Sequence, residues 1–332
     1  MCIRDRRDAA KDKGAKAAII IAPDAFEQYS AYFKRQAENG GSGRLSLNSN
    51  EPVMHMLLAN ENFGNAILAD MLTKDKPSSV AVNMQMNYTS KTEEVGSENV
   101  VAYIKGSEKP DEYIVISAHL DHVGINDGKI YNGADDDGSG TIAVLEIAEA
   151  FKAAADKGQG PKRSIVFLHV TGEEKGLLGS RHYTDNDPIF PLANTVANLN
   201  IDMIGRIDPE REGDRNYIYL IGSDKLSTEL HNISEDVNKK HTNIELDYTY
   251  NDENDPNRFY YRSDHYNFAK NNVPIIFYFN GTHADYHKDS DTVEKINFDL
   301  LENRSRLIFY TAWELANRDQ RIKVDKTEPS AN

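Results

Sequence analysis

The stretch YIVISAHLDH at residues 113–122 joins an apolar run to two histidines and an aspartate. Two further runs, at 165–168 and 274–279, are apolar without alternation. Strands of this kind are typical of sheets that are covered on both faces. Helical periodicity occupies 141–155 and 301–315. The pattern predicts an α/β fold in which a mostly parallel mixed sheet is sandwiched between helices.

Composition narrows the classes of function. The chain has 332 residues, 39% of them hydrophobic, with 53 acidic against 38 basic side chains and a net charge of -15. This balance argues against nucleic acid as a partner, because binding a phosphate backbone requires a basic face. No apolar run approaches the roughly 20 residues that span a bilayer. Cys2 is the single cysteine, so a multi-cysteine metal site and an internal disulfide are both excluded. The oligomeric state stays open.

Polar clusters follow the apolar runs or precede a helix. They are HLDH at 119–122, GADDDGSG at 133–140, TGEE at 171–174, Asp202, and YHKDSDT at 286–292. Since the carboxyl ends of parallel strands meet at one edge of a sheet, we expect these clusters to converge there. Histidine and carboxylate without cysteine suit zinc or a similar divalent ion, singly or as a pair.

Each cluster alone also has an ordinary structural explanation. A histidine after a strand is usually solvated, and an acidic pair often begins a helix. The acidic turn at 133–140 fails the spacing of a calcium-binding EF-hand, because Gly133 would occupy the first ligand position. Only the conjunction of all five clusters points to a metal centre.

These motifs, in this order, resemble the M28 family of di-zinc peptidases, whose members include bacterial leucyl-type aminopeptidases. The resemblance covers roughly residues 79–317 and implies the zinc-exopeptidase fold, which is phosphorylase/hydrolase-like. It also implies two Zn²⁺ ions. One would be held by His119 and Asp202, the other by Glu174 and His287, with Asp136 bridging both.

The resemblance makes Glu173 the general base. Adjacent side chains point in different directions, so Glu174 can bind metal while Glu173 takes a proton from water. Asp136 is chosen as the bridge over Asp135 by its distance from the Ser-Gly end of the motif. The family's cis peptide would then join Asp136 to Asp137.

Two further residues are candidates for the catalytic machinery. Asp121 projects to the same side as His119 on an extended chain, so its carboxylate is expected to accept the second imidazole N–H. Tyr260 matches the position of a tyrosine that stabilises the oxyanion in some M28 peptidases. Tyr261 is its rival, and packing under the loop is the alternative role for Tyr260.

The N-terminal 75 residues are expected to form a separate domain. KGAKAAIII at 13–21 resembles part of a protease-associated (PA) domain. We expect a partial PA-like domain over 1–75, a zinc peptidase domain over 76–322 and a polar tail over 323–332. Strands at 80–88 and 99–105 would pair antiparallel. From the resemblance, we expect the chain to be N-terminally truncated and the protein to work outside the cytoplasm, secreted or periplasmic.

The function predicted from these features is metal-dependent hydrolysis of peptide substrates, most simply release of N-terminal residues. Carboxypeptidase and glutaminyl-cyclase-like reactions on the same scaffold are alternatives, and so is a binding ectodomain without catalysis. Cyclases of that type use one zinc, whereas both ligand sets are present here, which favours hydrolysis. The complete ligand set also disfavours a binding module.

Overall fold

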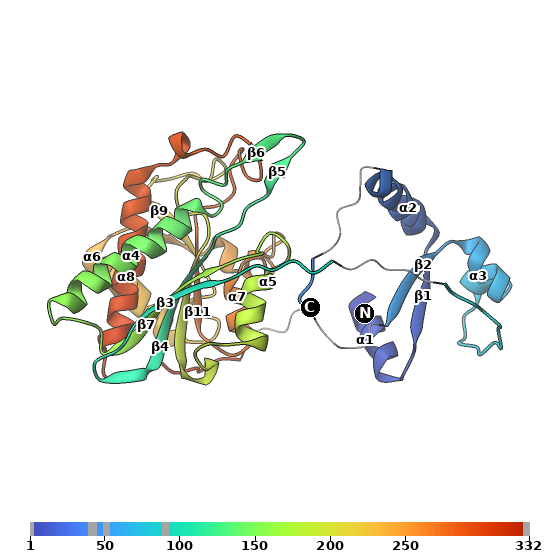
Figure 1. The fold of residues 1–332 in the computed structure, drawn as a ribbon, viewed down its shortest axis with the longest axis horizontal. Coiled ribbons are helices and arrows are strands. Elements are labelled where there is room, and N and C mark those ends of the chain that lie inside the picture. The colour runs from blue at the N-terminus through green and yellow to red at the C-terminus, as the bar shows by residue number, and fades with distance from the viewer. Residues whose placement is uncertain (1–2, 39–44, 49–53, 88–92, 328–332) are drawn as a thin grey trace. The chain divides into compact units, whose positions relative to one another are not determined.

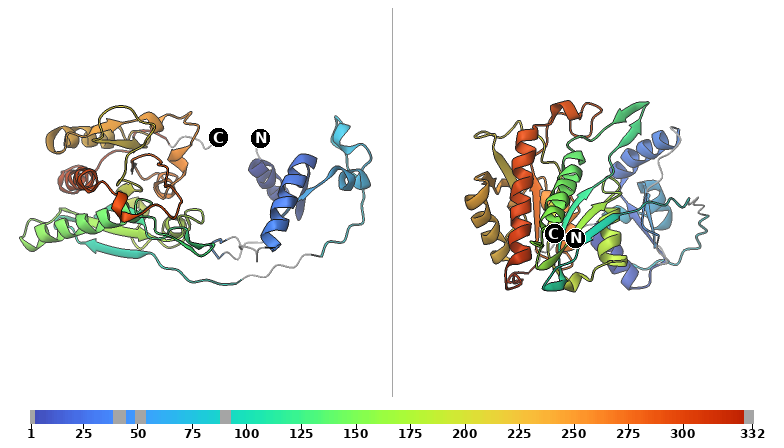
Figure 2. Two further views of the ribbon diagram at one scale, coloured as in Figure 1. Left: turned by 90° about the horizontal axis from the view of Figure 1, so that it is seen from above. Right: turned by 60° about the vertical axis from the view of Figure 1, so that its left-hand side comes forward.

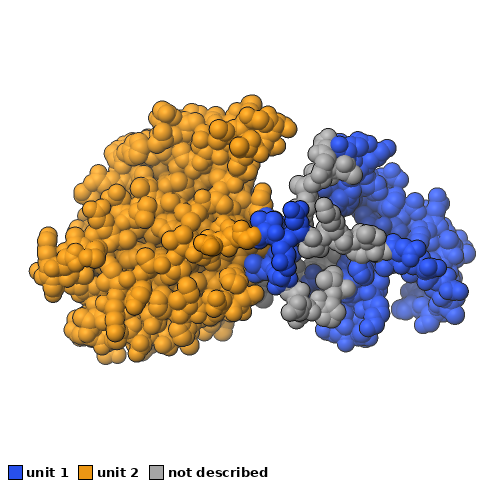
Figure 3. Space-filling view, viewed as in Figure 1, with its two compact units in different colours: residues 1–95 blue, residues 96–332 orange. Residues whose placement is uncertain are grey.

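The computed structural model describes residues 3–38, 45–48, 54–87 and 93–327, shown as a ribbon in Figure 1. The chain divides into two compact units, residues 1–95 and residues 96–332, which are coloured separately in Figure 3. The expected domain boundary after residue 75 therefore falls within the first unit. The PA-like identity of this unit stays a prediction.

The first unit contains a parallel pair of strands and several short helices. Strands β1 (Ala17–Ile21) and β2 (His55–Ala59) pair with Ala17 opposite His55. The helices are α1 (Ile3–Asp12), α2 (Pro23–Glu38), α3 (Glu61–Ile67) and a 3₁₀ turn at Met71–Thr73. Among the described residues of this unit, Ala59 and Gly64 alone are fully buried, so its described part has almost no core.

The predicted strand at 80–88 is wrong over residues 80–87, which form neither helix nor strand. Residue 88 lies outside the described residues. The apolar side chains of this stretch are exposed, including Val82 and Met84. An alternating sequence becomes a strand only where a partner covers its apolar face, and β3 (Val100–Ile104), the expected partner, pairs with β7 instead.

The second unit is built on a mixed, mostly parallel sheet, as predicted. Its described residues form seven strands in the order β10-β9-β11-β8-β4-β7-β3. Four neighbouring pairs are parallel, while β3–β7 and β9–β11 are antiparallel. The remaining bounds are β4 Lys109–His119, β7 Arg163–Val170, β8 Thr195–Ile201, β9 Tyr217–Ile221, β10 Glu245–Asp247 and β11 Ile275–Phe279. A separate hairpin joins β5 (Gly124–Asn126) to β6 (Lys129–Tyr131).

Helices cover both faces of this sheet. Helices α4 (Gly138–Asp156), α6 (Thr228–His241) and α8 (Phe298–Asn317) pack on one face, where α4 and α8 lie side by side (Figures 1 and 2). The short helices α5 (Leu178–Arg181) and α7 (His265–Ala269) pack on the other. Alternate residues of β4 serve the two cores, Ile114 and Ile116 facing α4 while Val115 faces α7. The predicted sandwich is confirmed.

Short helical turns complete the unit. They are 3₁₀ helices at Leu192–Asn194, Thr249–Asn251, Phe259–Tyr261 and Val293–Lys295, and a π-helix at His182–Asn186. Within the predicted polar tail, Asp325 donates its N–H to the carbonyl of Leu226 at 3.1 Å and accepts from the N–H of Thr228 at 2.9 Å. Residues 323–327 thus lie against the start of α6. In the described parts of the chain, no helix has the length and apolar character needed to cross a bilayer.

Candidate metal centre

Four parallel strands deliver the predicted site residues to one edge of the sheet. Strands β7, β4, β8 and β11 are neighbours and run in the same direction. Their carboxyl ends lead directly into the segments that carry His119, Glu173 and Asp202, and after a longer loop into His287. The expected convergence of the polar clusters is present.

His119, the last residue of β4, is held in one orientation. Its N–H donates to Asp137 Oδ2 at 3.1 Å, and its carbonyl accepts from Thr141 Oγ1 at 2.7 Å. Its Nδ1 lies 2.8 Å from the carbonyl oxygen of Asp121. A carbonyl only accepts, so Nδ1 carries the proton and Nε2 keeps its lone pair. That Nε2 faces Asp136 Oδ1 at 3.3 Å and Asp202 Oδ1 at 3.7 Å.

This geometry corrects the expected role of the Asp121 carboxylate. The main-chain carbonyl of Asp121 fixes the His119 tautomer, while the carboxylate oxygen lies 3.9 Å from Nδ1. The carboxylate accepts instead from the N–H groups of Glu173 at 3.1 Å and Glu174 at 3.3 Å. Asp121 therefore positions the glutamate pair.

Three consecutive aspartates have three different environments. Asp135 accepts from the N–H of Gly205 at 2.6 Å and lies 3.1 Å from His283 Nε2, so it faces away from His119. Asp136 turns its two oxygens to opposite sides, Oδ1 toward His119 and Oδ2 toward His287 at 3.1 Å. The choice of Asp136 over Asp135 agrees with this geometry. The peptide bond between Asp136 and Asp137 is cis, as predicted.

Asp137 lies close enough to His119 and Asp202 to count as a third donor. Its carboxylate, however, already accepts three main-chain N–H groups: those of His119, of Gly140 at 2.9 Å and of Met203 at 3.1 Å. It caps α4, and a Cβ on Gly140 would lie 2.4 Å from its Oδ1. With both oxygens occupied, Asp137 is a framework residue.

The loop after β8 is held from two sides. Asp202 Oδ2 accepts from Ser263 Oγ at 2.6 Å, which leaves Oδ1 facing His119. Behind it, the buried Arg304 of α8 donates to the carbonyls of Ile204 and Arg206, both at 2.7 Å. The same guanidinium donates to the carbonyl of residue 217 at 2.9 Å. Helix α8 thereby fixes the backbone that binds Asp135.

A second group of donors faces the other oxygen of Asp136. His287 Nε2 lies 3.3 Å from Glu174 Oε1, and His122 Nδ1 lies 3.0 Å from the same oxygen. His122 belongs to the motif at 119–122, but the sequence predicted no role for it. Its place three residues after His119 was the available signal. We call His119 and Asp202 the first cluster, and His122, Glu174 and His287 the second cluster; both adjoin Asp136.

The spacing of these donors fits bound zinc. Zn–N and Zn–O distances of about 2.0–2.1 Å in a tetrahedral site place ligand atoms about 3.3 Å apart. The distances facing Asp136 are 3.3 Å in the first cluster and 3.1 Å in the second. Several of the atoms involved are buried and lack a hydrogen-bond partner among the described residues: His119 Nε2, both ring nitrogens of His122, Asp136 Oδ2 and Glu174 Oε1. Such atoms are costly unless a cation satisfies them.

The adjacent glutamates are tuned in opposite directions. Burial raises the pKa of Glu173 well above its usual value, with a further contribution from nearby carboxylates. Burial acts on Glu174 too, but the imidazoles of His122 and His287 overcome it and lower the pKa of Glu174 to about 2. Neighbouring carboxylates with diverging pKa values are typical of a proton-transfer group beside an ionised ligand.

A cavity of about 430 Å³ opens beside both clusters. Glu173 lines it together with Tyr261, Arg262 and Tyr286. Tyr260 is buried with its ring 5.8 Å from His265 and is absent from this lining, so Tyr261 is the better placed of the two rivals. Tyr286, for which the sequence predicted no role, stacks on His287 with ring centroids 3.9 Å apart.

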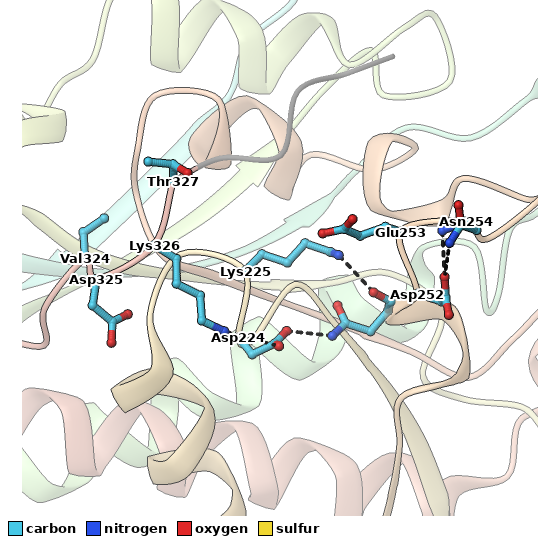
Figure 4. Close-up of a pocket in the computed structure, with 10 residues that line it drawn as sticks. Asp224, Lys225, Asp252, Glu253, Asn254, Val324, Asp325, Lys326 and Thr327 are labelled. Carbon is cyan, nitrogen blue, oxygen red and sulfur yellow. Dashed lines mark hydrogen bonds and ion pairs between the residues drawn. The ribbon is translucent and has the colours of Figure 1, made fainter.

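A larger cavity, of about 1160 Å³, lies between the loop at 251–254 and the C-terminal segment 324–327 (Figure 4). Several of its polar groups are already bonded to one another. Lys225 Nζ donates to the carbonyl of Asn251, whose amide donates to Asp224. It contains none of the metal-site donors, so we place the functional site at the smaller cavity.

The chain is similar to known peptidases over part of its length. It is 28% identical over 204 residues to aminopeptidase YwaD of Bacillus subtilis, covering 60% of this chain and 42% of that protein. It is 31% identical over 119 residues to the probable glutamate carboxypeptidase LAMP1 of Arabidopsis thaliana, covering 36% of this chain and 16% of the relative. The chain thus spans less than half the length of these relatives.

A solved structure gives the same fold. BSAP, a zinc aminopeptidase from Bacillus subtilis, superposes with a TM-score of 0.55 at 24% identity, over 69% of this chain and 53% of that one. The sequence model of peptidase family M28 matches residues 99–312, well over half of the chain. With the fold and the five motifs in the same order, the chain belongs to peptidase family M28.

Proposed function

We propose that the protein is a zinc-dependent aminopeptidase that uses two metal ions. The observation that carries this proposal is the Asp136 carboxylate, whose two oxygens face separate donor clusters, while Glu173 lines the cavity beside them. Zinc bound there lowers the pKa of a coordinated water toward 7 and polarises the scissile carbonyl.

The protein's own residues supply the proton transfers. The Glu173 carboxylate takes a proton from the attacking water while the water oxygen forms a bond to the carbonyl carbon of the substrate. It then gives that proton to the leaving amine as the C–N bond breaks. Asp121 holds the main chain of Glu173 in place. Burial raises the pKa of Glu173, which makes its carboxylate a stronger base toward the attacking water.

The cavity lining favours a substrate with an apolar side chain. Phe259, Phe279, Met203 and Leu177 contribute apolar surface beside the clusters. The net charge of -15 supports an amino terminus as the ligand, because an acidic field attracts a cation. Extracytoplasmic location, expected from the resemblance, remains part of this proposal.

Carboxypeptidase activity is the second candidate, and Arg262 favours it. This guanidinium lines the cavity and packs over the ring of Phe259 at 4.9 Å. A cation there suits a substrate carboxylate. The two candidates separate cleanly on aminoacyl-nitroanilides and on peptides blocked at one end. An aminopeptidase cleaves only those with a free amino terminus.

Glu173→Gln in the zinc-loaded protein tests the mechanism. We expect hydrolysis to fall by about 10²–10⁴-fold, because an amide accepts no proton at this step. Two zinc ions should remain bound, since Glu173 is not a donor. Glu149→Gln, an exposed residue of α4, is the matched control and should keep full activity. Undiminished hydrolysis in Glu173→Gln, or a zinc-reconstituted wild type without bound metal, overturns the proposal.

A further inference from the structure

His122 is the one metal-site histidine that the family motifs leave without a role. It lies three residues beyond the end of β4, and its Nδ1 is 3.0 Å from Glu174 Oε1 and 3.8 Å from Asp136 Oδ2. The side chain is only 7% exposed. Neither ring nitrogen has a hydrogen-bond partner within the described residues. A buried imidazole with two unsatisfied nitrogens is rare, and a bound cation would satisfy the one that faces the carboxylates.

The backbone is shaped to admit this ring. Gly133 has a φ of +61°, and a Cβ built there would lie 2.5 Å from His122 Cγ and 2.3 Å from the carbonyl oxygen of Asp136. Any larger residue at 133 would therefore displace the imidazole. The ring also meets that of His287 edge-on, with centroids 5.7 Å apart. His122 thus lies between Gly133 of the acidic turn and the ring of His287.

We propose that His122 is a direct ligand of the ion bound at the second cluster. That ion would be held by two imidazole nitrogens, from His122 and His287, and two carboxylate oxygens, from Glu174 and Asp136. The inference rests on the proposed two-metal function and deepens it.

The donor distances support a ligand role. The four separations that link the two imidazoles to Glu174 and Asp136 are 3.0, 3.1, 3.3 and 3.8 Å. They bracket the separation of about 3.3 Å between ligands of a tetrahedral zinc. In the competing role, His122 only orients Glu174 across the 3.0 Å contact between its Nδ1 and Oε1, and no bond joins the imidazole to the ion.

The proposal makes the two ions chemically unequal. The first cluster offers one imidazole with carboxylates, and the second offers two. Imidazole donors favour zinc, copper and nickel over manganese and magnesium. The second cluster should therefore hold zinc more selectively than the first.

Nuclear magnetic resonance with cadmium as the probe tests the inference. The full chain is labelled with ¹⁵N-histidine, stripped of metal and loaded with ¹¹³Cd. Each imidazole nitrogen bonded to cadmium then splits that resonance. We expect two ¹¹³Cd signals, one coupled to a single imidazole nitrogen and the other to two. His122→Asn should lose one coupling from the second signal only, and His169→Asn, an equally buried histidine bonded to the Thr141 carbonyl, should lose none.

The outcomes separate this inference from the proposed function. Two cadmium signals, each coupled to one imidazole in the wild type, overturn the ligand role of His122 and leave the two-metal proposal standing. Absence of a second bound cadmium overturns both. The wild-type spectrum alone decides, so a poorly folding His122→Asn variant does not weaken the test.

Discussion

The two clusters that share Asp136 differ in how they are built. His119 ends a central strand, and its side chain is 1% exposed. His287 lies in a loop with a φ of +54°, and its side chain is 41% exposed. Main-chain hydrogen bonds hold His119 in the first cluster, whereas His287 of the second cluster lines the cavity from an exposed loop. One half of the site is therefore part of the folded core, and the other half is added by loops, where a substrate can reach it.

Removing the carboxylate that the two clusters share should weaken metal binding at both of them. Asp136→Ala takes a donor from both clusters, so we expect both ions to bind more weakly, by more than the about 10–100-fold that a lost outer hydrogen bond costs. Activity should fall to background. Metal content after dialysis and hydrolysis of an aminoacyl-nitroanilide measure both effects. Retention of two tightly bound ions would contradict the bridging role.

Truncating one histidine from each cluster should destabilise the fold more in the buried cluster than in the loop. In metal-free protein, we expect His119→Ala to lower the free energy of unfolding by about 2–4 kcal/mol, because it empties a buried site. His287→Ala should cost less than about 1 kcal/mol, because it is half-exposed. His119→Ala should weaken the ion at the first cluster, and His287→Ala the ion at the second, while the other ion stays tightly bound in each variant. Urea unfolding and metal titration test this, and equal destabilisation would refute the contrast.

Loss of the hydroxyl behind Asp202 should affect the first cluster alone. Ser263→Ala removes the 2.6 Å hydrogen bond that orients this carboxylate. We expect the affinity of one ion to fall about 10–100-fold while the other is unchanged. Ser290→Ala is the control, since Ser290 donates to Asp285, which is not a proposed ligand. Competition with a chromophoric chelator measures both affinities. A loss shared by the two ions would count against the assignment of Asp202.

The free energy of unfolding should also depend on pH through Asp264, a buried residue near His119 and Asp202. Burial raises the pKa of Asp264 to about 7, and its Oδ1 accepts from Ser180 at 2.5 Å. The folded state keeps this proton up to about pH 7, while the unfolded chain releases it near pH 4. Stability contributed by protonated Asp264 is therefore present below pH 4 and lost as the pH rises toward 7.

Asp264→Asn tests this linkage in metal-free protein. Relative to the variant, the wild type should lose at most about 4 kcal/mol of unfolding free energy between pH 4 and pH 8. Denaturant unfolding at several pH values provides the measurement. Parallel pH profiles for the two proteins would show that Asp264 does not titrate in this range.

Much of the fold and site could be predicted because the signals are local. Unbroken apolar runs identify buried strands, and polar residues directly after them must lie at one sheet edge. His119, Glu174 and Asp202 follow from that rule together with the family motifs, and the cis bond after Asp136 follows from the motifs alone.

The remaining features depend on contacts that are distant in sequence. His122 faces Asp136 because the turn at Gly133 brings the two residues together. The Asp121 carboxylate turns from His119 to the glutamate loop some 50 residues later. Tyr260 and Tyr261 are adjacent, and the 3₁₀ turn at 259–261 decides which one reaches the cavity. Residues 80–87 do not form a strand because no strand among the described residues pairs with them.

Arg304 determines at which stage of protein synthesis the metal centre can form. The guanidinium reaches the loop after β8 from α8, and that loop binds Asp135. The proposed donors end at residue 287, so a ribosome-bound chain possesses all of them before Arg304 exists. The loop after β8 lacks the hydrogen bonds from Arg304 until helix α8 packs against the sheet. Metal loading should therefore follow completion of the catalytic unit, and a nascent chain stopped before residue 304 should bind zinc only weakly.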